Sequence, residues 1–385
     1  MTRLLTGCLI SLILCATTGC ATIGPQVTSQ EIQAARLELA IKGLRRTAEQ
    51  QQRVWKIGHQ LLVSLPPEEQ QTSYPDIGVG LAKIDKTSRT AFHLPDSIKR
   101  GVYVLSVREG SPAQTGGLMQ GDVVLAIRKS PCSSIASCIS VLGKAKPGEE
   151  LTFRIDRAGT PMEMAIVVGS RPRKIDFWVT SDQIVNAWTD DQNIVVTGGM
   201  LRFLESDDEL AVVLGHELAH VTGHHRGKET ATGVLSTLLG ATLGIAAEIA
   251  APGTGDAIMN ATSGLTQSAF MRNFEREADY KGLLHTFRAG YDASAGVNVW
   301  ERMGTDIPES LTQDLRSSHP ASPERMVRIR KVAQALAAEG LEATIAKYET
   351  QEAKTSDSTQ ELSTGVAETP PSVESASGFA QSAPQ

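Results

Sequence analysis

The segment Leu214-Gly215-His216-Glu217-Leu218-Ala219-His220 contains the pattern His-Glu-x-x-His. Ser206-Asp207-Asp208-Glu209 precedes it and is typical of a capping box, so we expect a helix to begin there. Residues four apart are neighbours on a helix, so His216 and His220 lie on one face. Two imidazoles at this spacing can bind one metal ion, and Glu217 can accept a proton from water at that metal.

The same helix carries an apolar stripe that we expect to face the core: Leu210, Leu214, Leu218 and Val221. A later histidine as third ligand would give the metzincin pattern, but Arg226 occupies that position. His224 lies two turns from His216, about 12 Å along the axis, which is too far to share a metal. We therefore interpret His224 and His225 as residues at the C-terminal end of the helix, where the dipole favours them.

Phe274-Glu275-Arg276-Glu277-Ala278-Asp279 lies in a second helical segment and offers a better third ligand. Glu275 and Asp279 share a face one turn apart, whereas Glu277 points about 160° away from Glu275. We predict that Glu275 completes the metal site and that Asp279 accepts a hydrogen bond from a metal-binding histidine. The alternative is a surface helix with salt bridges.

These motifs together resemble the gluzincin metallopeptidases of the CAAX prenyl protease and HtpX type, in their soluble periplasmic branch. The resemblance covers about residues 45–65 and 175–338. It implies an α+β fold, in which a mostly helical zincin-type catalytic domain carries a small edge-strand sheet and one Zn²⁺. Asn186 and Ala187 resemble the edge-strand segment that binds the substrate backbone. Ser318-His319-Pro320 resembles a late Thr-His-Pro motif, which implies that His319 stabilises the oxyanion or gates the zinc.

The first twenty residues resemble a lipoprotein signal peptide. Arg3 precedes an apolar run from Leu4 to Ala16, which is too short to span a bilayer. Thr17-Thr18-Gly19-Cys20 is similar to a lipobox and predicts lipidation of Cys20, while Ala21 after it favours the outer membrane over the inner. The alternative is a simple signal peptide. Either reading predicts export to the cell envelope, with the protein facing the periplasm.

The sequence pattern changes at residues 77–168, where short runs of alternating apolar and polar residues are divided by Gly and Pro. This pattern is typical of β structure. Gly78-Val79-Gly80-Leu81 resembles the carboxylate-binding loop of a PDZ domain, and residues 109–124 resemble the PDZ core that follows it. The resemblance implies that a peptide adds as a strand and that the loop binds its terminal carboxylate; a β module without a ligand is the alternative. Export favours a disulfide between Cys132 and Cys138.

The 385 residues carry 37 Lys and Arg against 43 Asp and Glu, a net charge of −6, and only 4% aromatic residues. An acidic chain without a basic block or a stacking platform is a poor nucleic-acid binder, so we expect no nucleic-acid partner. Residues 30–65 have helical periodicity. The predicted organisation is a signal peptide at 1–19, a helical part of the catalytic domain at 20–76, an interrupting PDZ-like domain at 77–170, the catalytic domain at 171–345 and a disordered tail at 346–385.

The sequence therefore predicts a zinc-dependent endopeptidase, a hydrolase for quality control of misfolded or unassembled envelope proteins, attached to the membrane by a lipid anchor. The PDZ-like domain would capture C-terminal or extended segments of polypeptide substrates.

Residues 234–251 are small and apolar, and we interpret them as a helical hairpin over the active site, with peripheral membrane contact as the alternative. The rival function is a PDZ adaptor or chaperone-like assembly factor with latent proteolysis. Glu217 favours the enzyme, because a structural zinc site needs no base.

Overall fold

The computed structural model describes residues 24–232, 254–307 and 322–350, together with Thr237, Thr242, Leu243, Ala247 and Ala251. Five predictions fall wholly or largely outside the described residues: the signal peptide at 1–19, lipidation of Cys20, most of the hairpin at residues 234–251, the role of His319, and the tail beyond residue 350. Within the described part, no helix is long and apolar enough to cross a membrane.

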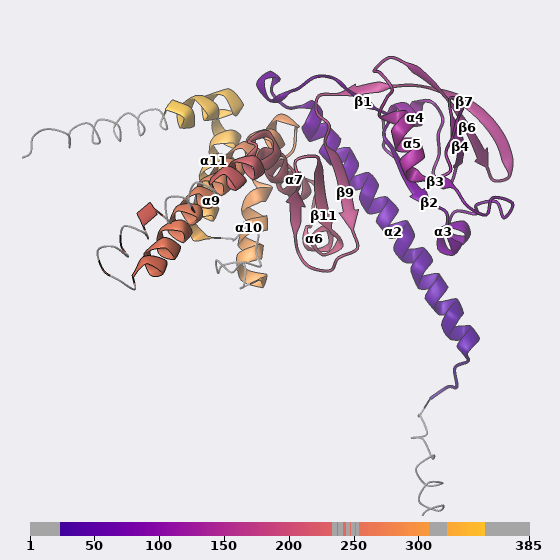
Figure 1. Ribbon diagram of the computed structural model, residues 1–385, viewed down its shortest axis with the longest axis horizontal. Helices are drawn as coiled ribbons and strands as arrows, with labels where there is room; N and C mark the ends of the chain where they lie inside the picture. The colour runs from indigo at the N-terminus through magenta and orange to yellow at the C-terminus, as the bar shows by residue number, and fades with distance from the viewer. Residues whose placement is uncertain are drawn as a thin grey trace, which may run out of the picture.

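A single long helix, α2 (Ser29–Val63), runs along both parts of the molecule (Figure 1). It begins at a capping box in which the Thr28 side chain accepts from the Glu31 N–H and the Glu31 carboxylate accepts from the Thr28 N–H. Its N-terminal half is mostly exposed, whereas Val54, Ile57 and Leu61 near its C-terminal end are buried. The helix ends just before Pro66, as the sequence predicts.

The peptidase part combines a small sheet with packed helices. The sheet has the order β10-β11-β9, in which β10 pairs antiparallel and β9 pairs parallel with β11. Among the described residues β10 is therefore an edge strand, which confirms the predicted small edge-strand sheet. The elements are β9 (Asp176–Thr180), β10 (Ala187–Thr189), β11 (Asn193–Thr197), α6 (Gly198–Phe203), α7 (Asp207–Thr222), α9 (Gly255–Arg288), α10 (Ala295–Asp306) and α11 (Pro323–Glu339).

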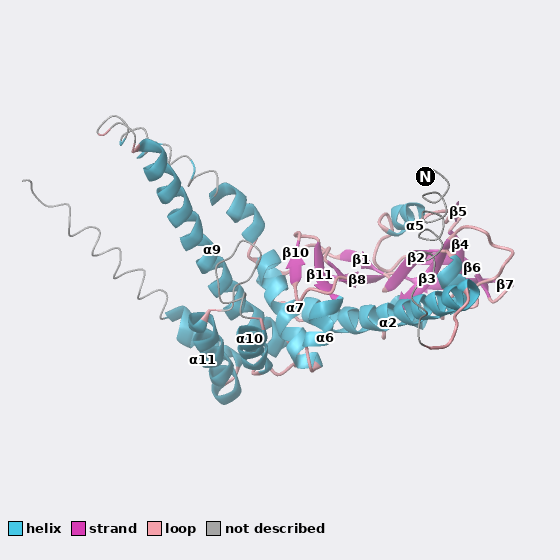
Figure 2. Ribbon diagram, turned by 90° about the horizontal axis from the view of Figure 1, so that it is seen from below, coloured by secondary structure: helices cyan, strands magenta, loops and turns pink. Residues whose placement is uncertain are grey.

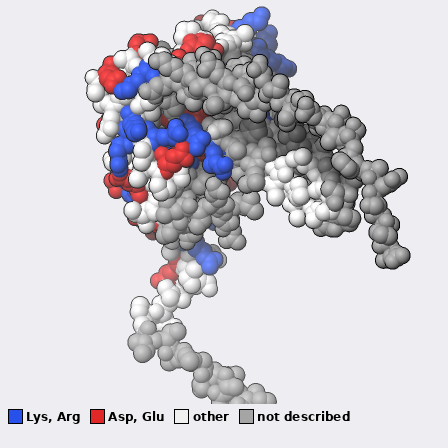
Figure 3. All heavy atoms as spheres, turned by 90° about the vertical axis from the view of Figure 1, so that its left-hand side faces the viewer, with Lys and Arg blue, Asp and Glu red and all other residues white. Residues whose placement is uncertain are grey.

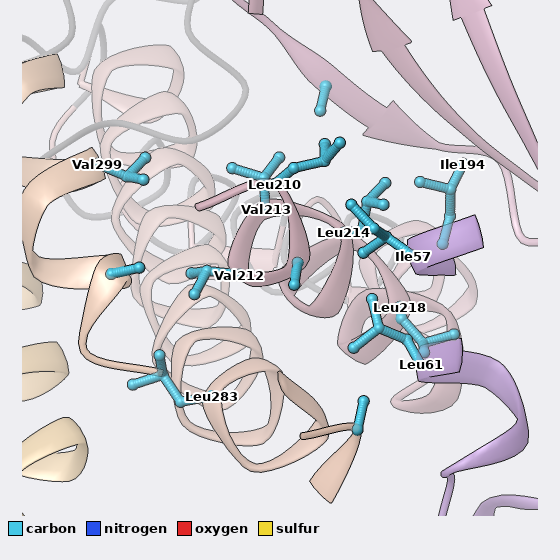
Figure 4. Close-up of a cluster of buried hydrophobic side chains, with 14 of the residues drawn as sticks. Ile57, Leu61, Ile194, Leu210, Val212, Val213, Leu214, Leu218, Leu283 and Val299 are labelled. Carbon is cyan, nitrogen blue, oxygen red and sulfur yellow. The ribbon is translucent and has the colours of Figure 1, made fainter. Parts of the chain in front are cut away.

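Helix α7 is the centre of this part. Its predicted apolar stripe is buried, and Figure 4 shows Leu214 and Leu218 beside Ile57 and Leu61 of α2. The opposite face is buried too, because α9 packs closely against it. A Cβ on Gly282 of α9 would lie 2.8 Å from the backbone of His216, so only glycine permits this approach. The close packing brings α9 directly over the histidine face.

The PDZ part is a separate β-rich unit with its own core, in the sheet order β2-β3-β4-β6-β7 with β5 beside β4. The β6–β7 hairpin turns at Ala158 and Gly159, which both have positive φ, as a tight two-residue turn requires. The strands are β2 (Val79–Lys83), β3 (Val102–Val107), β4 (Val123–Ile127), β5 (Ser130–Pro131), β6 (Glu150–Arg157) and β7 (Thr160–Val167). The helices are α3 (Lys86–Ala91), α4 (Pro112–Thr115) and α5 (Ile135–Leu142).

A two-stranded ribbon joins the two parts. Its strands are β1 (Tyr74–Asp76), where the chain leaves the peptidase part, and β8 (Gly169–Arg171), where it returns. Figure 2 shows β1 and β8 between the two larger sheets. The short helix η1 (Pro67–Glu69) precedes the ribbon, and its Glu69 lies 2.7 Å from His285 of α9.

Two sequence-based expectations need correction. The predicted disulfide is not formed: Cys132 and Cys138 are free thiols buried in the PDZ core. Their mutual hydrogen bond and burial raise the pKa of Cys132, which keeps it in the thiol form rather than the reactive thiolate. The tail was predicted to begin at residue 346, but residues 341–350 are helical and the ring of Tyr348 lies against Tyr280.

Basic and acidic side chains are interspersed on the described part of the face in Figure 3.

Candidate metal centre and active site

Two histidines and one glutamate converge at the contact between α7 and α9. The Nε2 atoms of His216 and His220 are 3.1 Å apart. Glu275 reaches both rings, with Oε2 3.5 Å from Nε2 of His216 and Oε1 3.3 Å from Nε2 of His220. All three residues are buried, and one ligand atom from each lies within 4.8 Å of the others.

These spacings fit a zinc ion. With metal–ligand bonds of about 2.0–2.1 Å in a tetrahedron, neighbouring ligand atoms are about 3.3–3.4 Å apart. The observed separations of 3.1, 3.3 and 3.5 Å bracket that value. Two imidazoles and one carboxylate are also a donor set that zinc enzymes use, because three protein ligands leave one position open for water or substrate.

The electrostatics of the cluster favour a cation. Burial acts to lower the pKa of His216, but the carboxylates of Asp279 and Glu275 outweigh it and raise this pKa to about 9. Burial lowers the pKa of His220, which keeps that ring in the neutral form that binds metals. Glu217, between the two histidines on α7, is 2% exposed and lies in the same buried region.

Asp279 lies where the helical geometry predicts, beside a histidine of the cluster. Its Oδ1 is 3.1 Å from Nδ1 of His216, the ring nitrogen that faces away from the other ligands. Burial raises the pKa of Asp279, but the Arg325 guanidinium outweighs this and holds the pKa below its ordinary value. Asp279 is therefore a carboxylate, able to accept a hydrogen bond from His216.

Arg325 of α11 joins the two acidic residues of α9. Its Nη2 and Nε lie 2.7 and 2.8 Å from the two Asp279 oxygens, and its Nη1 lies 2.9 Å from Oε2 of Glu275. The side chain is buried, so these pairs are shielded from solvent. In the sequence, Arg325 simply follows the late Ser-His-Pro motif, and nothing there indicates a contact with the metal cluster. The contact depends on how α11 packs on α9.

His225 is not the helix-end residue that the sequence suggested. Helix α7 ends at Thr222, the chain turns through His224 with a positive φ of 53°, and His225 begins the next helical segment. Its Nδ1 lies 2.9 Å from Nδ1 of His220, and its ring stacks on Phe274 at 4.8 Å. Gly223 makes room, because a Cβ there would lie 2.4 Å from the His225 ring.

Glu277 stays outside the three-residue cluster, as expected, but it is connected to it. Its Oε2 lies 3.2 Å from Nε2 of His225, and Oε1 lies 2.9 Å from Lys281. The contact with His225 lowers the pKa of Glu277 to about 2. Each histidine of the cluster is therefore linked to a carboxylate on α9. His216 contacts Asp279 directly, whereas His220 is connected to Glu277 through His225.

The edge strand lies next to this centre, since β10 contacts α7. Asn186 accepts a hydrogen bond from Thr197 N–H at 3.1 Å, which directs its backbone toward β11. In an antiparallel pair, successive residues direct their backbone N–H and C=O groups alternately toward the partner strand and away from it. The backbone groups of Ala187 and Thr189 therefore face the open edge of β10. Arg226 already donates to the Thr189 carbonyl at 3.0 Å, which leaves Ala187 as the position for an added strand.

The His-Glu-x-x-His helix, with a glutamate from a second helix and an adjacent edge strand, defines a zincin-type metallopeptidase site. Residues 157–333 match the model of peptidase family M48, and residues 75–168 match that of the PDZ domain. These two matches confirm the resemblance, inferred from the motifs, to a zinc metallopeptidase with a PDZ domain.

Three curated relatives illustrate the similarity. The chain is 34% identical to "Mitochondrial metalloendopeptidase OMA1" of Arabidopsis thaliana, over 38% of this chain and 29% of that protein. It is 30% identical to the "Putative beta-barrel assembly-enhancing protease" of Vibrio cholerae, over 40% and 34%. It is 25% identical to "Metalloprotease YcaL" of Escherichia coli, over 59% and 86%. The match therefore spans about a third of the first two relatives.

Proposed function

We propose that this chain is a zinc-dependent endopeptidase of the cell envelope that cleaves misfolded or unassembled envelope proteins. The observation that carries the proposal is the cluster of His216, His220 and Glu275, whose spacing fits zinc, with Glu217 beside it. A structural zinc site is closed by four protein ligands, whereas this cluster offers three among the residues that the structure describes. Zinc would be held by these three residues, one ion per chain.

The residues would divide the chemistry as follows. When bound, zinc polarises the scissile carbonyl and acidifies water. The Glu217 carboxylate accepts a proton from the attacking water and then donates it to the leaving amine. Asp279 and His225 hold the rings of His216 and His220 in orientation. Ala187 on the open edge of β10 aligns the substrate backbone as an added strand.

The late His319 is proposed to stabilise the oxyanion or to gate the zinc, on the family resemblance alone. Attachment to the outer membrane is proposed to come from lipid on Cys20, with the enzyme facing the periplasm. The name of one relative, a putative β-barrel assembly-enhancing protease, supports an envelope role. Mass spectrometry of the mature protein should show a lipidated Cys20; an unmodified N-terminus elsewhere would contradict this anchor.

The PDZ domain is proposed to capture the substrate, with the loop Gly78–Leu81 binding the C-terminal carboxylate or an extended segment. Purified protein should be incubated with casein and with an unfolded outer-membrane protein, with and without a chelator. Cleavage that the chelator abolishes, that added zinc restores and that Glu217→Gln lacks supports the proposal. Cleavage that persists in zinc-free protein or in Glu217→Gln contradicts it, since another site would then perform the reaction.

A further inference from the structure

The groove beside the PDZ loop has walls from both parts of the molecule. It is a cavity of about 430 Å³. Strand β2 and helix α5 contribute the PDZ wall, including Val79, Leu81 and Ile139. Helix α2 and strand β9 of the peptidase part contribute the facing wall, including Trp55 and Trp178.

The backbone of β2 is available along this groove. β2 is the terminal strand of the PDZ sheet, paired only with β3 among the described residues. Gly78 at its start has a φ of 72°, a conformation that glycine adopts without strain. Its carbonyl accepts from the Arg108 N–H, whereas its own N–H has no acceptor within the described part of the chain. This edge can therefore accept an extended peptide as a further strand.

Side chains alternate along β2, so the groove has two different faces. Val79 and Leu81 pack toward the PDZ core together with Ile135 and Leu142 of α5. A side chain at Gly80 would point to the opposite face, where a Cβ would lie 2.9 Å from the Trp55 ring. A peptide that pairs with β2 would likewise send alternate side chains toward α5 and toward the tryptophans.

The two tryptophans form an aromatic surface supplied by the peptidase part. Their ring centroids are 6.3 Å apart. Trp178 is 40% exposed, and its Nε1 donates to Oδ1 of Asn193 at 2.9 Å, which fixes the ring direction. An exposed, fixed indole next to a cavity provides apolar area for a ligand at a small entropic cost.

The charges of the groove suit a carboxylate. Arg108 pairs with Asp76, and Arg171 pairs with Asp176 at 2.6 Å. Lys174 is exposed and has no acidic side chain within ion-pair distance among the described residues, so the lining carries one excess positive charge. Burial and then the Arg108 charge lower the pKa of His59 to about 4, which is consistent with a positive surrounding.

We propose that this groove is a composite peptide site in which the peptidase part reads every second residue of the ligand. The ligand is a polypeptide with a free C-terminus, whose last side chain is apolar and packs against α5. The penultimate side chain is aromatic or large and aliphatic, and it packs on Trp55 and Trp178. The inference rests on the proposed capture of substrates by the PDZ domain and adds a specificity that the PDZ domain alone does not contain.

The test measures binding of short fluorescent peptides to the full chain carrying Glu217→Gln, which prevents cleavage. One peptide ends in Val-Trp-Val, a second in Val-Ser-Val, and a third is the first with an amidated C-terminus. Trp178→Ala should weaken the tryptophan peptide about 3- to 10-fold and leave the serine peptide unchanged, because the aromatic contact is lost only in the first. Ile184→Ala removes an exposed apolar side chain of the peptidase part outside the groove lining and should change neither affinity.

The outcomes separate the two proposals. Ile139→Asp, an exposed position on the α5 wall, should weaken both free-carboxylate peptides. If neither free-carboxylate peptide binds, the proposed capture is wrong, and the composite site with it. If both bind and Ile139→Asp weakens both, but Trp178→Ala affects them equally or not at all, capture stands and the composite site is wrong. Trp55→Ala is judged by the same comparison, after circular dichroism shows that it is folded.

Discussion

Glu275, Glu277 and Asp279 lie within five residues of one helix, yet only Glu275 and Asp279 contact the two histidines of the metal cluster. Their spacing explains this, because residues four apart share a face of a helix, whereas Glu277, two positions from each of them, points to the other side. Helical geometry therefore predicts that His216 and His220 share one face and that Glu275 and Asp279 share another, whereas the contact between the two faces depends on how α9 packs on α7.

The first prediction concerns these acidic residues and the base. Glu275→Gln should lose zinc and activity, because an amide is a much weaker ligand than a carboxylate. Asp279→Asn should bind zinc roughly 10- to 100-fold more weakly, since it orients a ligand without being one. Glu217→Gln should keep zinc and lose turnover. Elemental analysis together with peptidase rates measures all three, and full zinc occupancy in a folded Glu275→Gln protein would overturn the assignment.

The contact of His225 with His220 could not be predicted from the sequence. A continued helix would carry it away from His220, and only the turn at Gly223 and His224 folds its ring back. That turn depends on a positive φ at a non-glycine residue, which periodicity does not predict. The same turn gives Glu277 a role that its helical direction alone did not suggest.

The second prediction tests that role. His225→Phe keeps a ring to stack on Phe274 but removes the nitrogen that contacts His220, so zinc affinity should fall about 10- to 100-fold. Glu277→Gln should have a smaller effect and still bind zinc at stoichiometric concentrations, whereas Lys281→Gln should match the parent. Competition with a zinc chelator gives the affinities. Unchanged affinity in His225→Phe, with an unchanged melting temperature, would show that His225 only fills space.

At the scale of elements, the apolar stripe of α7 was predictable, but the burial of its other face was not. That burial depends on the contact between Gly215 and Gly282, glycines on two helices distant in the sequence. The PDZ strands and their turns were predictable because Gly and Pro mark them locally. The ribbon of β1 and β8 was not, since it pairs residues on either side of a whole domain.

The third prediction concerns the anchoring of that ribbon. Burial raises the pKa of Glu69, but its contact with His285 outweighs burial and holds the pKa below the ordinary value of 4.5. The stabilisation is therefore present above pH 4.5 and is lost as the pH falls through the lower pKa of the folded state. Glu69→Gln should destabilise the chain by about 1 kcal/mol at pH 7.

Thermal unfolding of the parent and of Glu69→Gln at several pH values measures this difference. The difference should shrink as the pH is lowered below 4.5, because the parent then protonates the same carboxyl. Glu68→Gln is the matched control, since Glu68 is adjacent and exposed. A difference that stays constant down to pH 3 would contradict an ionised Glu69 as the cause.

At the scale of the whole molecule, the peptidase part and the PDZ part have separate cores. The segment before the PDZ domain shares the peptidase core, because Val54, Ile57 and Leu61 of α2 pack with residues beyond position 174. The PDZ domain therefore sits within the peptidase part as an insertion. The family resemblance of residues 45–65 and 175–338 implied this insertion, but the sequence did not predict that α2 and Trp178 would face the PDZ groove.

The last prediction follows from the ribbon that carries the insertion. Asp76 pairs with Gly169, so the two ends of the PDZ domain are adjacent, and Asn-Gly in place of residues 77–168 closes them as a two-residue hairpin. Because the core around α7 contains no residue of the deleted segment, this variant should fold, bind zinc and cleave a short unstructured peptide at close to the parent rate. It should cleave a full-length unfolded protein much more slowly at low substrate concentration, where capture limits the rate, and approach the parent at saturation. Peptide and protein cleavage rates, measured over a range of substrate concentrations, distinguish the two effects. Equal rates on both substrates at every concentration would show that the PDZ domain does not recruit, whereas loss of the short-peptide activity with zinc still bound would show that it shapes the active site itself.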